Sequence, residues 1–192
     1  MHIKRIIAII PVIISILFYW SCDYHHTKEL EEEIKRETIT IPLDSLELLS
    51  SQHIEYNSNF NPDYRYFVYF DSLDCAVCKL HKMGIWHSIM KHTKDIGAKV
   101  EFIFVFHPTP DKLAAFREEF NKRKIHLKIY LDSIGVTERS IPILKRGASY
   151  RAFIIDKKGH IIAIGDASKS ERIEKKYYKI LREKYNKESK EQ

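Results

Sequence analysis

Hydrophobic positions in this chain form short, continuously apolar runs that alternate with longer amphipathic stretches. The runs at 66–70 (YFVYF) and 100–106 (VEFIFVF) have the length and the aromatic and β-branched content of buried strands. Between them, residues 76–94 place an apolar side chain at almost every third position, which predicts one continuous helix with an apolar stripe. A second helix is expected over 111–123, after the break that His107-Pro108-Thr109-Pro110 imposes. The middle of the chain therefore alternates strand, helix, strand, helix.

The remaining elements are predicted to be shorter. In chain order they are a strand at 38–41, a strand at 125–131, a loop at 132–150, two strands at 152–155 and 161–164, and a helix at about 170–185. The last two strands flank Asp156-Lys157-Lys158-Gly159, a sequence typical of a hairpin turn. Asp132 is likewise expected to begin a turn. The pattern predicts an α/β fold, a three-layer sandwich in which helices flank a central mixed sheet.

The N-terminus has the composition of an export signal. The basic pair Lys4-Arg5 precedes an apolar run at 6–20, and a small residue and then Cys22 follow it. The run is shorter than the roughly 20 residues that a membrane-spanning helix needs. Because a small residue before cysteine is similar to the bacterial lipoprotein signal, we expect 1–21 to be a signal peptide and Cys22 the lipid-attachment site. An uncleaved anchor and ordinary cleavage remain alternatives, because Tyr19-Trp20 departs from the lipoprotein pattern.

Beyond the leader, the chain has room for one domain on a tether. Residues 22–37 are mostly polar and are expected to form the tether, 38–185 the domain, and 186–192 a polar C-terminal tail. The formal net charge is +6, and the basic residues are interspersed with acids. We therefore interpret the basic C-terminal segment as a solvated helix face and expect no nucleic-acid partner.

The strongest chemical signal is the pair Cys75 and Cys78, which lies where the strand at 66–70 gives way to the predicted helix. Two cysteines three apart in a first helical turn share a face, so their sulfurs can close a small disulfide ring or open to a dithiol. Free backbone N–H groups at a helix N-terminus favour a thiolate on Cys75. We therefore predict Cys75 as the attacking and Cys78 as the resolving cysteine, at the sheet edge where active sites of open α/β folds lie.

A metal site is not favoured by the sequence. A CxxC supplies half of the ligands of many zinc sites, but the chain has no second CxxC, and His87 and His92 follow Cys78 at the wrong spacing. We expect His81 and the other helix histidines to be solvated, Trp86 to be a core residue, and the protein to use neither metal nor cofactor.

Residues 70–79 (FDSLDCAVCK) resemble the thioredoxin pattern of strand, turn and CxxCK, and 129–132 (IYLD) and 151–162 (RAFIIDKKGHII) resemble the second half of the tethered thiol-disulfide oxidoreductases and redoxins. The chain looks closest to lipoprotein members of the thioredoxin-like superfamily from Gram-negative bacteria. The resemblance implies a thioredoxin-like fold and a membrane-tethered oxidoreductase that acts on protein or small-molecule thiols and disulfides. It also implies reduction rather than formation of disulfides, with electrons from an unidentified membrane donor, in the cell envelope facing the periplasm.

The sequence departs from the thioredoxin pattern at three places. Asp74 replaces the tryptophan that usually precedes the first cysteine, Ala76-Val77 replaces Gly-Pro, and no proline precedes the strand that follows Arg151. Asp74 opposes a thiolate on Cys75, whereas Lys79 favours it. Asp74, Lys79 and Arg151 are therefore candidate auxiliary residues of the site.

Two other functions remain open at this point. The domain could be a non-enzymatic binding module in which the CxxC forms a structural disulfide. It could also be a redoxin-type peroxide reductase, with Arg151 as the candidate arginine that orients the peroxide. Asp71 and Asp74 are expected to be surface turn residues, with proton acceptance near Cys78 as the alternative.

Overall fold

A computed structural model of the chain describes residues 33–34, 37–49, 60–123, 125 and 127–188, and the structural statements below concern these residues. The expected signal peptide, Cys22 and most of the expected tether lie outside them. The chain divides into two compact units, Met1–Glu37 and Thr38–Gln192, and the second contains every element named below. Among the described helices, none combines the length and the apolarity that crossing a membrane would require.

The second unit is built from strands in two orientations and five helices within the described residues. The strands are β1 (Glu47–Leu49), β2 (Tyr64–Phe70), β3 (Val100–Phe106), β4 (Ile129–Leu131), β5 (Ala152–Asp156) and β6 (Ile161–Ile164). The helices are α2 (Ala76–His81), α3 (Ile85–Asp95), α4 (Leu113–Lys122), α5 (Val136–Ser140) and α6 (Glu171–Glu188). Short 3-10 turns lie at Leu43–Ser45, Pro110–Lys112, Pro142–Arg146 and Ala148–Tyr150.

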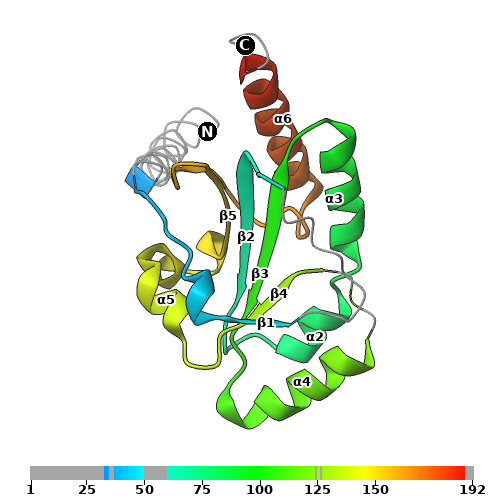
Figure 1. Cartoon of the computed structure of the whole chain (residues 1–192), viewed down its shortest axis with the longest axis vertical. Helices are drawn as coiled ribbons and strands as arrows, with labels where there is room; N and C mark the ends of the chain where they lie inside the picture. Colours follow the sequence, from blue (N-terminus) through cyan, green and yellow to red (C-terminus); the bar gives the residue numbers. More distant parts are fainter. Residues whose placement is uncertain (1–32, 35–36, 50–59, 124, 126, 189–192) are drawn as a thin grey trace, which may run out of the picture. The chain divides into compact units, whose positions relative to one another are not determined.

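The strands form one sheet in the order β1-β4-β3-β2-β5-β6. Strands β2, β3 and β4 are mutually parallel, and β1, β5 and β6 run antiparallel to their neighbours. Helices α2 and α3 connect β2 to β3, α4 connects β3 to β4, and α6 follows the β5–β6 hairpin. Figure 1 shows α2, α3 and α4 on one side of the central strands and α5 on the other. This order and connectivity define a thioredoxin-like fold, so the predicted α/β fold class is confirmed.

Both faces of the central strands are buried, which is why β2 and β3 have nearly continuous apolar sequences. On the helix-covered face, Trp86 packs between Tyr66 and Phe104, with ring centroids 5.3 and 5.0 Å away. On the opposite face, Phe67 of β2 stacks on Phe153 of β5 at 4.9 Å. Trp86 is only 2% exposed, so its prediction as a core residue is confirmed.

The continuous helix predicted at 76–94 is wrong: α2 ends at His81, and α3 begins at Ile85. The buried residues of this stretch lie three apart, at Leu80, Met83, Trp86 and Ile89. In an uninterrupted α-helix a three-residue step turns about 300°, so such a stripe would drift off the sheet by about 60° per step. The junction instead has three-residue turns, in which the N–H of Trp86 donates to the carbonyl of Met83. The break therefore keeps the apolar residues on one face.

Several element boundaries also differ from the prediction. The expected strand at 38–41 makes a single isolated bridge, between Thr38 and His160, and the expected strand at 125–131 is reduced to β4. Strand β1 was not predicted, because its three residues lie at the exposed edge of the sheet and have no alternating pattern. The helix predicted at 170–185 continues to Glu188.

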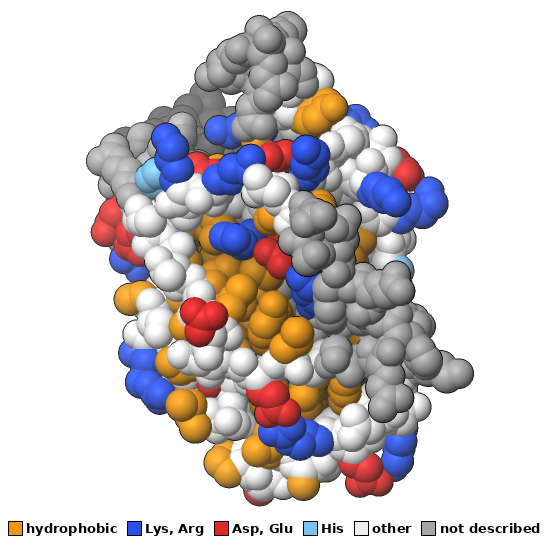
Figure 2. All heavy atoms as spheres, viewed as in Figure 1, with side chains coloured by type: hydrophobic (Ala, Val, Ile, Leu, Met, Phe, Trp, Pro, Cys, Tyr) orange, Lys and Arg blue, Asp and Glu red, His pale blue; other side chains and the backbone are white. Residues whose placement is uncertain are grey.

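The surface of the molecule mixes charges of both signs. On the face that Figure 2 shows, Lys and Arg side chains lie among Asp and Glu, and hydrophobic side chains gather near the centre. Large hydrophobic residues with substantial exposure are Leu48, Phe60, Leu73, Ile85, Ile134 and Tyr185. Leu73, at 89% exposure, is two residues before Cys75, so an apolar side chain stands in the solvent next to the cysteine pair.

Asp132 organises a segment that the sequence predicts as a loop. The region 132–150 contains α5 and two 3-10 turns, so the loop prediction is wrong there. The Asp132 carboxylate, 1% exposed, accepts the N–H groups of Val136 at 2.9 Å and Thr137 at 2.8 Å. Burial alone would raise the pKa of this carboxyl, but these hydrogen bonds and nearby His107 outweigh it, so its pKa lies below the ordinary value. Asp132 thus begins the turn, as predicted, and also starts a helix.

Asp132→Asn is expected to lower the free energy of unfolding at pH 7 by about 1–3 kcal/mol, because a buried acceptor is replaced by an amide. The folded pKa is depressed, so the carboxylate stabilises the fold above its unfolded pKa of about 3.9 and loses that contribution as pH falls through the folded value. Urea unfolding followed by circular dichroism should show the gap between wild type and variant narrowing below about pH 4. The exposed Asp44→Asn variant is the control, and a gap that stays constant with pH would contradict the ionic contribution.

Candidate functional site

The loop from β2 to α2 is held by the first residue after the strand. Asp71 is 6% exposed, and its Oδ1 accepts the N–H groups of Leu73 at 3.1 Å and Asp74 at 3.0 Å. Such a turn, closed by an aspartate on the backbone two and three residues later, reverses the chain over a short distance. It delivers Cys75 to the N-cap of α2, where its backbone is still extended.

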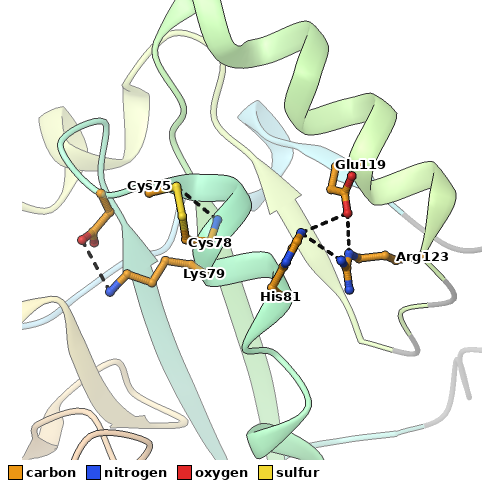
Figure 3. Close-up of a disulfide and its surroundings, with 7 residues drawn as sticks. Cys75, Cys78, Lys79, His81, Glu119 and Arg123 are labelled. Carbon is orange, nitrogen blue, oxygen red and sulfur yellow. Dashed lines mark hydrogen bonds and ion pairs between the residues drawn. A yellow bond between two sulfur atoms is a disulfide. The ribbon is translucent and has the colours of Figure 1, made fainter.

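Cys75 and Cys78 form a disulfide, with their Cα atoms 5.2 Å apart. Both residues are exposed, so burial does not distinguish them. The Cys75 Sγ also accepts the backbone N–H of Cys78 at 3.3 Å (Figure 3). After reduction this N–H would face the Cys75 sulfur and favour its negative charge. The geometry therefore brings the two predicted cysteines together at the carboxyl end of β2 and gives Cys75 a donor.

The candidate auxiliary residues lie around the same loop. Lys79 Nζ is 3.5 Å from Asp74 Oδ1, so the two charges that act oppositely on Cys75 face each other. Arg151 lies immediately before β5, and its Nη2 forms an ion pair with Asp71 Oδ2. A small cavity of about 40 Å³ has Asp74, Lys79 and Arg151 in its lining. The three residues that the sequence singled out are thus neighbours, and the cavity between them has room for about one water molecule.

Asp71 corrects a sequence prediction. The sequence predicts a surface turn residue here, but Asp71 is buried, and its carboxylate binds both its own loop and Arg151. Arg151 also accepts the N–H of Tyr69 at its carbonyl, at 2.8 Å. The residue before β5 is therefore fastened to the end of β2 by its backbone and to the cysteine loop by its side chain. In the sequence, the only sign of an unusual contact here is that no proline precedes β5.

The helix histidines have separate local partners. His81 Nε2 lies 3.0 Å from Glu119 and 2.9 Å from Arg123 of the α4 region, as Figure 3 shows. His92 stacks on Tyr178 of α6, with ring centroids 4.0 Å apart. In the part of the chain that the structure describes, no three His, Cys, Asp or Glu side chains are grouped so as to hold a metal ion.

No family model and no curated protein matches this sequence. Among solved structures, the chain is similar to a candidate thiol:disulfide interchange protein, DsbE, from Chlorobium tepidum, with 16% identity, a TM-score of 0.45, and coverage of 65% of this chain and 84% of that one. It is similar to StoA from Bacillus subtilis, with 17% identity, a TM-score of 0.39, and coverage of 54% and 74%. It is also similar to an uncharacterized thioredoxin-like protein from Porphyromonas gingivalis, with 17% identity, a TM-score of 0.46, and coverage of 77% and 95%.

The protein thus has a thioredoxin-like fold and an exposed CxxC pair. The strand order of the sheet shows the fold, and the Cys75–Cys78 disulfide at the junction of β2 and α2 shows that the two cysteines form a pair.

Proposed function

We propose that this protein is a thiol-disulfide oxidoreductase that uses Cys75 and Cys78. One observation carries the proposal: the disulfide is exposed at the start of α2, and the backbone N–H of Cys78 points at the Cys75 sulfur. Exposure gives a substrate access to the sulfur, and the N–H stabilises the thiolate that must attack or leave.

The exchange runs through a mixed disulfide. In the reduced protein, the Cys75 thiolate attacks one sulfur of a substrate disulfide, and the other substrate sulfur leaves as a thiolate. Cys78 then loses its proton to solvent and attacks the Cys75 sulfur, which releases the second substrate thiolate and closes the Cys75–Cys78 disulfide. Two electrons pass from the cysteine pair to the substrate, and a separate thiol donor must return the pair to the dithiol.

Three finer features belong to the same proposal. Electrons flow toward substrate disulfides, the protein is held on the membrane through lipidated Cys22, and it faces the periplasm of the cell envelope. The sequence of the leader and the resemblance to tethered reductases support these features. The donor is then a membrane protein able to reduce an exposed disulfide.

Arg151 favours exchange over peroxide reduction. A peroxide-orienting arginine directs N–H groups at the attacked oxygen, whereas Arg151 directs its Nη2 at the carboxylate of buried Asp71. Its place between β5 and the cysteine loop suits a structural role. A structural CxxC disulfide in a binding module remains the competing interpretation, and the pair's reduction potential separates the two.

The test is a redox equilibrium of the full chain that carries Cys22→Ala, so that the thiols trapped belong to Cys75 and Cys78. The protein is equilibrated with thiol buffers of known potential, and free thiols are alkylated and counted by mass. We expect a midpoint between about −120 and −270 mV, the range of proteins that exchange disulfides. A pair that stays oxidised below about −300 mV would show a structural disulfide and overturn the proposal.

A further inference from the structure

An open cavity of about 520 Å³ lies beside the cysteine pair. Its lining comes from the end of α2, from the junction between α2 and α3, and from the loop that precedes α6. Lys79, the residue after Cys78, is part of it. The volume is in the range of small-molecule and side-chain pockets. The break at the helix junction, which the sequence did not predict, therefore borders a pocket whose lining begins one residue after Cys78.

Part of this pocket is apolar. Phe70, Met83 and Trp86 contribute to the lining and are 7%, 2% and 2% exposed. Ile85 also lines it, and its side chain is 47% exposed. An apolar group placed here would cover Ile85 and contact the buried residues behind it, which is favourable in proportion to the apolar area removed from water.

The charged part of the pocket is mainly cationic. Lys79, Lys82 and Lys169 line it, against one carboxylate, Asp166. Lys79 and Lys169 lie 3.5 and 3.6 Å from their acidic partners, which is longer than the roughly 2.7–2.9 Å of a good ammonium–carboxylate hydrogen bond. Lys82 has no ion-pair partner among the residues that the structure describes. Asp166 is further occupied, because its Oδ1 accepts both the N–H and the hydroxyl of Ser168. The pocket therefore offers ammonium groups to an anion.

We propose that this lysine pocket, lined by Lys79, Lys82, Lys169 and the apolar residues above, binds an acidic and apolar peptide segment of the disulfide substrate. The proposal rests on the exchange proposed above and names its substrate class. Lys82 follows Cys75, the attacking cysteine, by seven residues along α2, a rise of about 10 Å. An extended peptide advances about 3.3 Å per residue. The acidic side chain is thus expected about three residues from the substrate cysteine.

Gly84 allows the pocket to be filled without strain. It lines the pocket, its backbone has ordinary helical angles (φ −57°), and a Cβ built on it meets no atom within 4 Å. Gly84→Trp should therefore leave the backbone in place and put an indole into the space. Lys82→Glu reverses the charge of the unpaired lysine. Lys94→Glu makes the same charge change at an exposed position of α3 outside the pocket and is the matched control.

The experiment uses the reduced full chain with Cys22→Ala and two short peptides, each holding its single cysteine in a mixed disulfide with thionitrobenzoate. The peptides share a phenylalanine next to the cysteine and differ only in Glu or Lys at the third residue from it. Release of thionitrobenzoate is followed by absorbance, and each rate is divided by the same variant's rate with a third thionitrobenzoate peptide that has neutral Gln at that residue. Calorimetry with the same peptides carrying serine in place of cysteine measures binding without exchange.

The Glu peptide is expected to react about 5–10 times faster than the Lys peptide, the size expected of a few solvent-accessible ion pairs. Gly84→Trp should bring the ratio close to 1, Lys82→Glu should lower it at least about threefold, and Lys94→Glu should keep it. Equal rates and equal binding of both peptides in the wild type would overturn the lysine pocket while leaving the exchange intact. A binding preference without any thionitrobenzoate release would support the pocket and overturn the exchange.

Discussion

The Cys78→Ser variant is expected to accumulate a covalent mixed disulfide with a peptide substrate through Cys75, and the Cys75→Ser variant is expected to accumulate none. Turnover should fall in both by on the order of a thousandfold or more, because one variant lacks the nucleophile and the other cannot resolve the intermediate. Cys75 is placed as the attacker because its sulfur receives the N–H of Cys78 at the start of α2. Intact mass after incubation with a peptide disulfide, with Cys22→Ala in every sample, measures the adduct.

Both cysteines are exposed, so a substrate can reach either sulfur and the opposite assignment of roles can be tested. If Cys75→Ser forms the adduct through Cys78 and Cys78→Ser forms none, the two roles are reversed, and the N–H contact does not decide which sulfur attacks. Ser88→Ala, on the exposed face of α3, provides a control that should exchange at the wild-type rate, since its hydroxyl only bonds the carbonyl of Ile85.

Asp71→Ala is expected to lower the free energy of unfolding by about 2–4 kcal/mol. The change removes the acceptor of two backbone N–H groups in the cysteine loop and leaves the Arg151 guanidinium without its partner. The side chains of Asp71 and Arg151 are 8% and 21% exposed, so water restores little of what is lost. Urea unfolding gives the free energy, and the midpoint of the redox titration should shift as the loop loosens.

Asp74→Ala is the matched control, three residues away in the same loop. Its side chain is 30% exposed and lies 3.5 Å from Lys79, so its loss should cost less than about 1 kcal/mol. Arg151→Ala and the double variant Asp71→Ala/Arg151→Ala complete a double-mutant cycle. An interaction free energy near zero would show that Arg151 and Asp71 stabilise the fold independently. If Asp71→Ala costs no more than Asp74→Ala, Asp71 does not hold the loop.

The Asp71–Arg151 ion pair connects the start of β5 to the cysteine loop. Strand β5 pairs with β2 and brings residue 151 beside the end of β2, where the cysteine loop begins. Where the resemblance leads one to expect a proline facing the cysteines, this chain has an arginine whose side chain binds Asp71 of the cysteine loop. The cysteine loop is thus fixed from two sides: by the backbone of its own turn and by a residue 80 positions later.

The sequence by itself determined the strands at 66–70 and 100–106, the hairpin that turns at Gly159, and the placement of Cys75 and Cys78 between a strand and a helix. These depend on neighbouring residues: runs of apolar side chains, a turn in which Gly159 has a φ of 85°, and two cysteines three apart. Only the tertiary structure decided the burial of Asp71 and its pairing with Arg151, the edge strand β1, and the break between α2 and α3 that borders the lysine pocket. Each of these depends on which strands lie side by side or on which face a helix must keep against the sheet, and such long-range contacts leave no local pattern in the chain.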